Sequence, residues 1–153
     1  MTAPRGAAID DLIVDHNTAI PGGYSTYYVE AATAPAIVRF RMTNNILGFG
    51  SFGVTFPKAD AALAKWLPGA IVARNALVNL ADTADGQGPA RNVRHEISQT
   101  MYMSFASAAA AGLNPDGTLT PKSPNRRTGT DGKDVGVDFD ELQRAMMGQS
   151  SRR

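Results

Sequence analysis

The sequence predicts a mainly β protein of the α+β class, with a small antiparallel-sheet body, one or two short helices and an extended C-terminal arm. Three observations lead to this prediction. Apolar and polar residues alternate over residues 92–105, as in a strand with one buried face. The same alternation recurs over residues 37–43. From Asn114 onward apolar residues become rare and prolines and glycines accumulate, which is typical of a linker or arm.

Length and composition predict one globular domain. A chain of 153 residues with 43% hydrophobic and 19% charged residues can bury a sizeable core. Its net charge of +1 gives no general attraction to nucleic acid or to a membrane surface. The lack of cysteine excludes disulfides, thiolate nucleophiles and sulfur-based zinc sites. We find no secretory signal at the start and no apolar stretch of membrane length, so we expect a soluble protein.

Five stretches have the composition or the alternation of strands. In one of them Val38, Phe40 and Met42 face one way, while Arg39 and Arg41 face the other. The others are rich in Val, Ile, Tyr and Phe, which suit a pleated surface. The predicted strands are residues 24–31, 37–43, 51–56, 70–80 and 92–105.

Helical patterns are fewer. Residues 58–66 contain good helix formers between Pro57 and the Pro-Gly pair at residues 68–69. Residues 7–15 place three apolar side chains on one side of a short helix. Residues 106–113 predict a helical turn that Gly112 would cap.

The change of composition predicts three parts: a β-rich body over residues 1–113, a polar linker or arm over residues 114–133, and a short amphipathic docking segment over residues 134–153. In the last part Asp138 can cap a helix, with Glu141 placed as in a capping box. A strand added to a sheet edge is the alternative, and a loose end without a role is a second one. The predicted docking residues are Val135, Val137, Phe139, Leu142 and Met146.

Residues 48–56, GFGSFGVTF, contain three glycines at the spacing of a dinucleotide-binding loop. That loop needs a helix directly after it, whereas a strand-like stretch ending in Pro57 follows here. Ser51 is not in a nucleophile elbow, because Phe49 stands in place of the first glycine. The stretch therefore predicts neither a nucleotide cofactor nor acyl-transfer chemistry.

The aromatic residues of the same stretch indicate another function class. GFGSFGVTF, followed by KADAALAKW and ARNALVNLAD, resembles the third strand, second helix and fourth strand of an RNA-recognition motif domain. In that family alternate aromatics of the strand stack on bases. The resemblance implies Phe49 and Phe52 as stacking residues, and Arg39 and Arg41 as phosphate contacts. Two extra residues interrupt the family's alternation between the two phenylalanines.

Acidic residues do not form a recognisable metal site. Asp10, Asp11 and Asp15 lie near His16, but a solvated helix face accounts for them equally simply. The three Asp-Gly turns do not continue into a calcium-binding loop. We therefore expect no metal and no cofactor.

The regional charge balance and the arm together predict the function class. The body carries eight basic and eight acidic residues, and the remainder carries seven and six. We expect a non-enzymatic structural or assembly subunit of a phage or viral particle, such as a coat, decoration or connector protein. It would contact copies of itself or other subunits through its sheet edges and its C-terminal arm. Such a protein would be particle-associated, and otherwise cytoplasmic. A single-stranded nucleic-acid-binding domain is the alternative.

Overall fold

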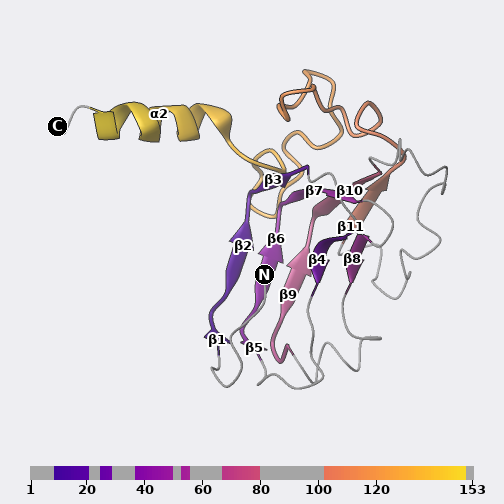
Figure 1. Cartoon of the computed structure of the whole chain (residues 1–153), viewed down its shortest axis with the longest axis vertical. Coiled ribbons are helices and arrows are strands. Elements are labelled where there is room, and N and C mark those ends of the chain that lie inside the picture. The colour runs from indigo at the N-terminus through magenta and orange to yellow at the C-terminus, as the bar shows by residue number, and fades with distance from the viewer. Residues whose placement is uncertain are drawn as a thin grey trace.

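The computed structural model of the chain describes residues 9–20, 25–28, 37–49, 53–55, 67–79 and 102–150. These residues form eleven short strands and one helix, so the expected β-rich character is confirmed (Figure 1). The strands are β1 (Ile9–Asp10), β2 (Ile13–Asp15), β3 (Thr18–Ala19), β4 (Ser25–Tyr28), β5 (Ile37–Val38), β6 (Arg41–Thr43), β7 (Ile46–Phe49), β8 (Gly53–Thr55), β9 (Ile71–Ala73), β10 (Asn75–Asn79) and β11 (Tyr102–Phe105). The helix is α2 (Phe139–Ser150).

All neighbouring strands in the described sheets run parallel, so the predicted antiparallel body is wrong. The four sheets are β1-β5, β2-β6-β9, β3-β7-β10-β11 and β4-β8. Alternation shows that a strand has one buried face, but it does not identify the neighbouring strand. Antiparallel neighbours can follow one another through a hairpin, whereas a parallel neighbour needs a long return connection.

Each described strand pairs in parallel with a strand that the chain reaches only after a long return connection, so the chain is a parallel β-solenoid. Thr18 in β3 lies beside Ile46 in β7, and Ile46 lies beside Ala76 in β10. Hydrogen-bonded positions on successive coils are 28 and then 30 residues apart. The first coil contains β1 to β4, the second β5 to β8, the third β9 and β10, and the fourth β11. Figure 1 shows β2, β6 and β9 side by side as three layers of this stack.

Each coil turns at left-handed corner residues that stack on one another. The first corner is formed by Asp11, Arg39 and Gly69, with φ of 57°, 57° and 72°. The Asp11 N–H donates to the carbonyl of Val38, and the Arg39 N–H to that of Pro68. The corner therefore repeats in register from coil to coil.

The second corner repeats in the same way. His16, Asn44 and Arg74 have φ of 49°, 57° and 56°. The stretches 37–43 and 70–80, each predicted as one strand, therefore form two strands each, because a corner bends the chain at Arg39 and at Arg74. The inward-facing positions change parity at this corner, because Val72 before Arg74 and Leu77 after it both belong to the interior cluster although they are five residues apart.

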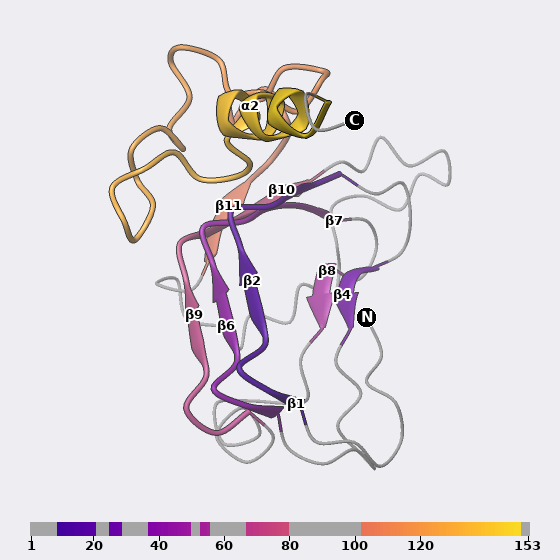
Figure 2. The same cartoon turned by 90° about the vertical axis from the view of Figure 1, so that its left-hand side faces the viewer.

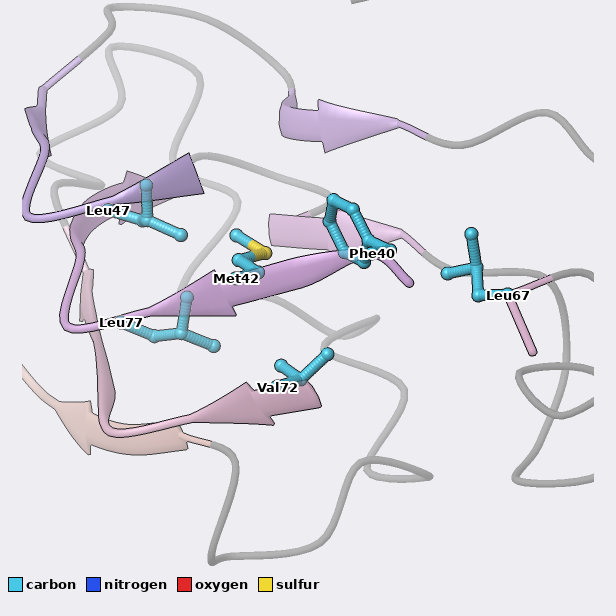
Figure 3. Close-up of a cluster of buried hydrophobic side chains, with 6 residues drawn as sticks. All are labelled: Phe40, Met42, Leu47, Leu67, Val72 and Leu77. Carbon is cyan, nitrogen blue, oxygen red and sulfur yellow. The ribbon is translucent and has the colours of Figure 1, made fainter. Parts of the chain in front are cut away.

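Apolar side chains fill the inside of the solenoid (Figure 3). Members of the second and third coils, together with Leu67, are almost completely buried. Partly buried side chains of neighbouring coils pack against them. The buried members are Phe40, Met42, Leu47, Leu67, Val72 and Leu77.

The sheet β3-β7-β10-β11 is buried on both faces. Leu47 and Leu77 point into the solenoid, whereas Ile46, Ala76 and Val78 lie in a second cluster on the other face. Residues 106–137, which we call the cover segment, supply the rest of that second cluster. Their buried members are Ala111, Leu113 and Val135.

The helical turn predicted over residues 106–113 is present at the start of the cover segment. The N–H of Leu113 donates to the carbonyl of Ala108, and the N–H of Gly112 to that of Ala109. Together with a φ of 67° at Gly112, these bonds form a Schellman cap.

The remaining predicted elements have mixed outcomes. The strands at 24–31 and 51–56 are confirmed as β4 and β8. The helix predicted over 7–15 is wrong, since β1 and β2 occupy its described part. The end of the strand at 92–105 is confirmed as β11. Its earlier part and the helix at 58–66 lie outside the described residues.

The helix α2 follows the cover segment and points away from the solenoid. Asp138 caps it as predicted, because its carboxylate accepts a hydrogen bond of 2.9 Å from the Glu141 N–H. The alternative of an added strand over residues 135–139 is wrong. Figures 1 and 2 show α2 extending past the first coil, on the side of β2 and β3. No helix among the described residues is long and apolar enough to span a membrane.

Candidate interaction surface at the first coil and the C-terminal helix

An asparagine ladder runs through the second corner. Asn17, Asn45 and Asn75 each follow a corner residue and stack on successive coils. The side-chain oxygen of Asn45 accepts from the backbone N–H and the amide of Asn17, at 3.0 Å each. The side-chain oxygen of Asn75 accepts in the same way from Asn45, at 3.1 and 2.8 Å. The asparagine of each coil therefore donates two hydrogen bonds to the side-chain oxygen of the asparagine in the next coil.

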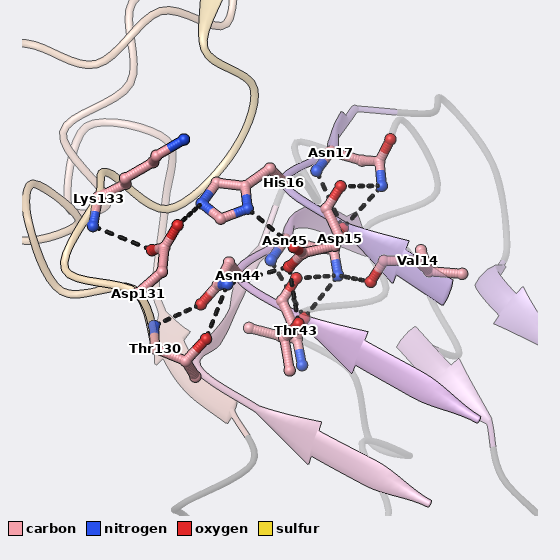
Figure 4. Close-up of polar contacts among 11 residues, drawn as sticks. Val14, Asp15, His16, Asn17, Thr43, Asn44, Asn45, Thr130, Asp131 and Lys133 are labelled. Carbon is pink, nitrogen blue, oxygen red and sulfur yellow. Dashed lines mark hydrogen bonds and ion pairs between the residues drawn. The ribbon is translucent and has the colours of Figure 1, made fainter. Parts of the chain in front are cut away.

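The corner needs this ladder because it interrupts the sheet. The amide of Asn45 also donates to the carbonyls of Val14 and Thr43, at 2.9 and 2.8 Å (Figure 4). Asn75 donates to the carbonyl of Met42 at 2.8 Å. Side-chain amides thus replace the backbone partners that the bend removes, and buried polar groups stay paired.

The ladder stops at the first coil. Asn45 and Asn75 are 0% exposed, whereas Asn17 is exposed. In the described part of the chain no hydrogen bond reaches the side-chain oxygen of Asn17. The side-chain oxygen that accepts two hydrogen bonds at Asn45 and at Asn75 is therefore open at Asn17 among the described residues.

The solenoid interior is also incompletely covered at the first coil. Leu12 and Val14 are half-buried, whereas their counterparts Phe40 and Met42 in the second coil are 1% and 0% exposed. β2 and β3 are the outermost strands of their sheets among the described residues. We call this end of the solenoid, formed by β2 and β3, the first-coil edge.

The cover segment is anchored at the second corner through Asn44. The side-chain oxygen of Asn44 accepts from the Thr130 N–H at 2.7 Å, and its amide donates to the Thr130 hydroxyl at 2.9 Å (Figure 4). The Asn44 carbonyl accepts from the Gly136 N–H at 2.7 Å. Further along, the Val137 N–H donates to the Thr18 hydroxyl at 3.1 Å.

His16 links the first coil to the cover segment. Its Nδ1 lies 3.2 Å from a carboxylate oxygen of Asp15, and its Nε2 lies 3.6 Å from one of Asp131. The Nε2 atom is buried and has no partner within hydrogen-bond distance in the described structure. The two ring nitrogens therefore face two carboxylates, one from the first coil and one from the cover segment.

Asp15 makes the stability of this corner dependent on pH. Burial raises the pKa of Asp15, but hydrogen bonds from Thr43, His16 and Asn44 lower it more, so the pKa lies below 3.8. The folded state thus favours the carboxylate, and its contribution is complete above the unfolded pKa and lost as the pH falls through the folded one. We expect Asp15→Asn to remove part of the acid sensitivity below about pH 4, measured as the slope of Tm against pH. Asp140→Asn on α2 is the control. An unchanged slope in Asp15→Asn would contradict the assignment.

A groove of about 450 Å³ lies between the cover segment, the second corner and the start of α2. Basic and acidic side chains share its walls, and Arg126 is already bound to Asp134 at 3.0 Å. The mixture gives no preference for an anion or for a cation. Its ionisable members are His16, Arg126, Arg127, Lys133, Asp134, Asp138 and Asp140.

The helix α2 makes few contacts with its own chain. Phe139 at its start is half-buried and approaches Gly117, but residues 140–148 are all exposed. Leu142 is 45% exposed and Met146 is 66% exposed. A helix of 12 residues is marginal in water unless its apolar side is covered, so α2 presents an unfilled contact surface.

Some of the predicted docking residues pack on their own chain, and the others are exposed on α2. Val135 is 1% exposed and packs against Ile46 of the same chain, and Val137 is half-buried. Leu142 and Met146 are exposed on α2. The division of the chain at Asn114 stays a prediction. The structure shows that residues 114–137 pack on their own solenoid.

The RNA-recognition resemblance implied residues that are only partly described by the structure. Phe49 ends β7 and residues 53–55 form β8 in another sheet, while Phe52 lies outside the described residues. Arg39 makes a two-fold hydrogen bond with Asp11, with one distance of 2.7 Å, which lowers the pKa of the Asp11 carboxyl. Arg41 is exposed on the neighbouring sheet. The charge of Arg39 is therefore already balanced locally.

The ladder residues were missed in the sequence, although a signal was present. Asparagine follows each corner residue, in His16-Asn17, Asn44-Asn45 and Arg74-Asn75. Aligning LIVDHNTAI, FRMTNNILG and AIVARNALV shows that these pairs recur after 28 and then 30 residues. Such a repeat is the mark of a solenoid, and it is found by comparing the sequence with itself.

Comparison with known proteins gives no match: no family model fits the chain, and neither the curated proteins nor the solved structures include one significantly similar to it.

Proposed function

We propose that this protein is a non-enzymatic assembly subunit that associates with copies of itself through the exposed helix α2. The observation that carries the proposal is the position of α2. It projects from the solenoid (Figure 1). Its apolar side chains Leu142, Met146 and Met147 are exposed. Large exposed apolar side chains grouped on one element are typical of protein-protein contact sites.

The anchoring of the cover segment supports this role. Hydrogen bonds from Thr130, Gly136 and Val137 to the solenoid fix the chain directly before α2. The Asp138 cap then sets where the helix begins. A contact helix held in this way loses less freedom on binding than a flexible tail would.

Changing the apolar face of α2 tests the proposal. We expect the full chain to form multimers, and the double variant Leu142→Asp with Met146→Asp to raise the dissociation constant at least tenfold, because two carboxylates would enter an apolar contact. Light scattering over a concentration series measures this change.

The control makes the same change in net charge on the other side of the helix. Arg144 is exposed on α2 and lies two residues from Leu142 and from Met146, on the opposite side of the helix. We expect Arg144→Glu to associate like the unmodified chain. A chain that stays monomeric at every concentration, or equal weakening by both variants, would contradict the proposal.

A further inference from the structure

The first-coil edge has the hydrogen-bonding groups on which another coil could stack. Every interior step of the ladder has an oxygen that accepts from a backbone N–H and a side-chain amide of the preceding coil. Asn17 presents the same oxygen at an exposed position. The group that fits there is the backbone N–H and amide of another asparagine, in a strand running parallel to β3.

The apolar interior points to the same occupant. Leu12, Val14 and Ala19 pack against the buried cluster but stay half-exposed, whereas the second-coil residues directly behind them are buried. Another coil with apolar inward residues would complete their burial. A strand added in parallel would also use the backbone groups at the free side of β2 and β3.

The helix α2 extends over the space that such coils would occupy (Figure 1). Its 12 residues span about 18 Å, and stacked strands are about 4.8 Å apart. The overhang therefore has the length of about three to four coils. The cover segment shields the outer face of β7 and β10, and α2 continues from that segment toward the open end.

A second copy of this chain does not fit the ladder. To stack in parallel, a copy would have to present its last coil to the first-coil edge. In the fourth coil Tyr102 lies beside Asn75 and so occupies the ladder position. Tyrosine supplies no side-chain amide to Asn17, so the ladder could not continue across that junction.

We propose that the first-coil edge binds the end of a different β-solenoid polypeptide, whose terminal coil carries asparagine at the ladder position and stacks in parallel on β2 and β3 beneath α2. The proposal goes beyond the self-association proposed above, because its partner is not a copy of this chain. It assigns Asn17 as the register-setting residue, and Leu12, Val14 and Ala19 as the apolar contact.

A coil supplied in the same chain serves as the probe. A second copy of residues 9–36 is inserted between Ala8 and Ile9 of the full chain, which places an asparagine one repeat before Asn17. We expect amide hydrogen exchange of residues 13–15 and of Leu142 to slow at least tenfold. The matched control carries Asn→Ala at the inserted asparagine, and we expect it to lose most of this protection.

A second insertion keeps the test decisive if the first disturbs folding. It uses a copy of residues 37–64, whose ladder residue is Asn45. Faster or unchanged exchange of residues 13–15 in both insertions, or equal protection by the alanine control, overturns the proposal. The inserted coil could protect β2 from exchange while the chain stays monomeric. That result would support stacking of a coil on the first-coil edge and count against self-association through α2. The two proposals can therefore fail separately.

Discussion

Replacing Asn45 by alanine is expected to lower the free energy of unfolding by about 3 kcal/mol. The side chain is completely buried and takes part in five hydrogen bonds that join three coils. Each buried polar group that loses its partner costs about 1–3 kcal/mol. Among these groups the carbonyl of Thr43 is buried at the corner, where water does not replace the amide.

The same substitution at the exposed end of the ladder provides the control. Asn17 donates to the carbonyl of Asp15 and to Asn45, but its surroundings are open to solvent. Asn17→Ala should therefore cost about 1 kcal/mol. Urea unfolding followed by circular dichroism measures both values. Equal losses would show that the ladder does not hold the coils together.

Gly112→Ala is expected to destabilise the cover segment by about 3 kcal/mol. Gly112 has φ of 67°, where an L side chain costs about 1–2 kcal/mol. A Cβ atom there would also lie 2.5 Å from the Cα of Ser123, and such overpacking costs about 1–3 kcal/mol. Because the neighbour is backbone, the stretch of the segment around Gly112 must move away from the stretch around Ser123.

Gly132→Ala separates these two costs. Gly132 has φ of 78°, but a Cβ atom there would meet nothing within 4 Å. We expect a loss of about 1 kcal/mol from the backbone alone. Limited proteolysis within residues 114–133, compared with urea unfolding, measures whether the segment detaches. If both glycine variants behave alike, the contact with Ser123 is not a determinant of the fold.

The sequence predicts strands well in this protein because inward and outward residues alternate. Phe40 and Met42 are buried and Arg39 and Arg41 are exposed, as the pattern indicates. The pattern does not reveal the corner at Arg39, because Val38, Phe40 and Met42 fit one continuous strand in the sequence, whereas in the structure Ile37 packs against the same interior cluster as Phe40. It also does not reveal the neighbour of each strand, because the pairing partner lies a full coil away.

The cover segment resembles a linker because its polar residues satisfy backbone groups instead of solvent. The Asn125 amide and the Ser123 hydroxyl both donate to the Ala111 carbonyl, at 2.8 Å each. Asp134 accepts from the Arg127 N–H at 2.9 Å. Irregular segments without strand partners need such residues, so composition alone does not distinguish them from a solvated linker. The Asp138 cap, in contrast, depends only on local sequence and is predicted correctly.

The unequal spacing of the ladder has an evolutionary consequence. Asn17 and Asn45 are 28 residues apart and Asn45 and Asn75 are 30 apart, yet the amides meet with the same geometry. Insertions and deletions between the coils are therefore tolerated, whereas one residue gained or lost between a corner and its strand would turn every following side chain to the opposite face. Related sequences should vary in length outside the corner-strand units and stay constant in length within them.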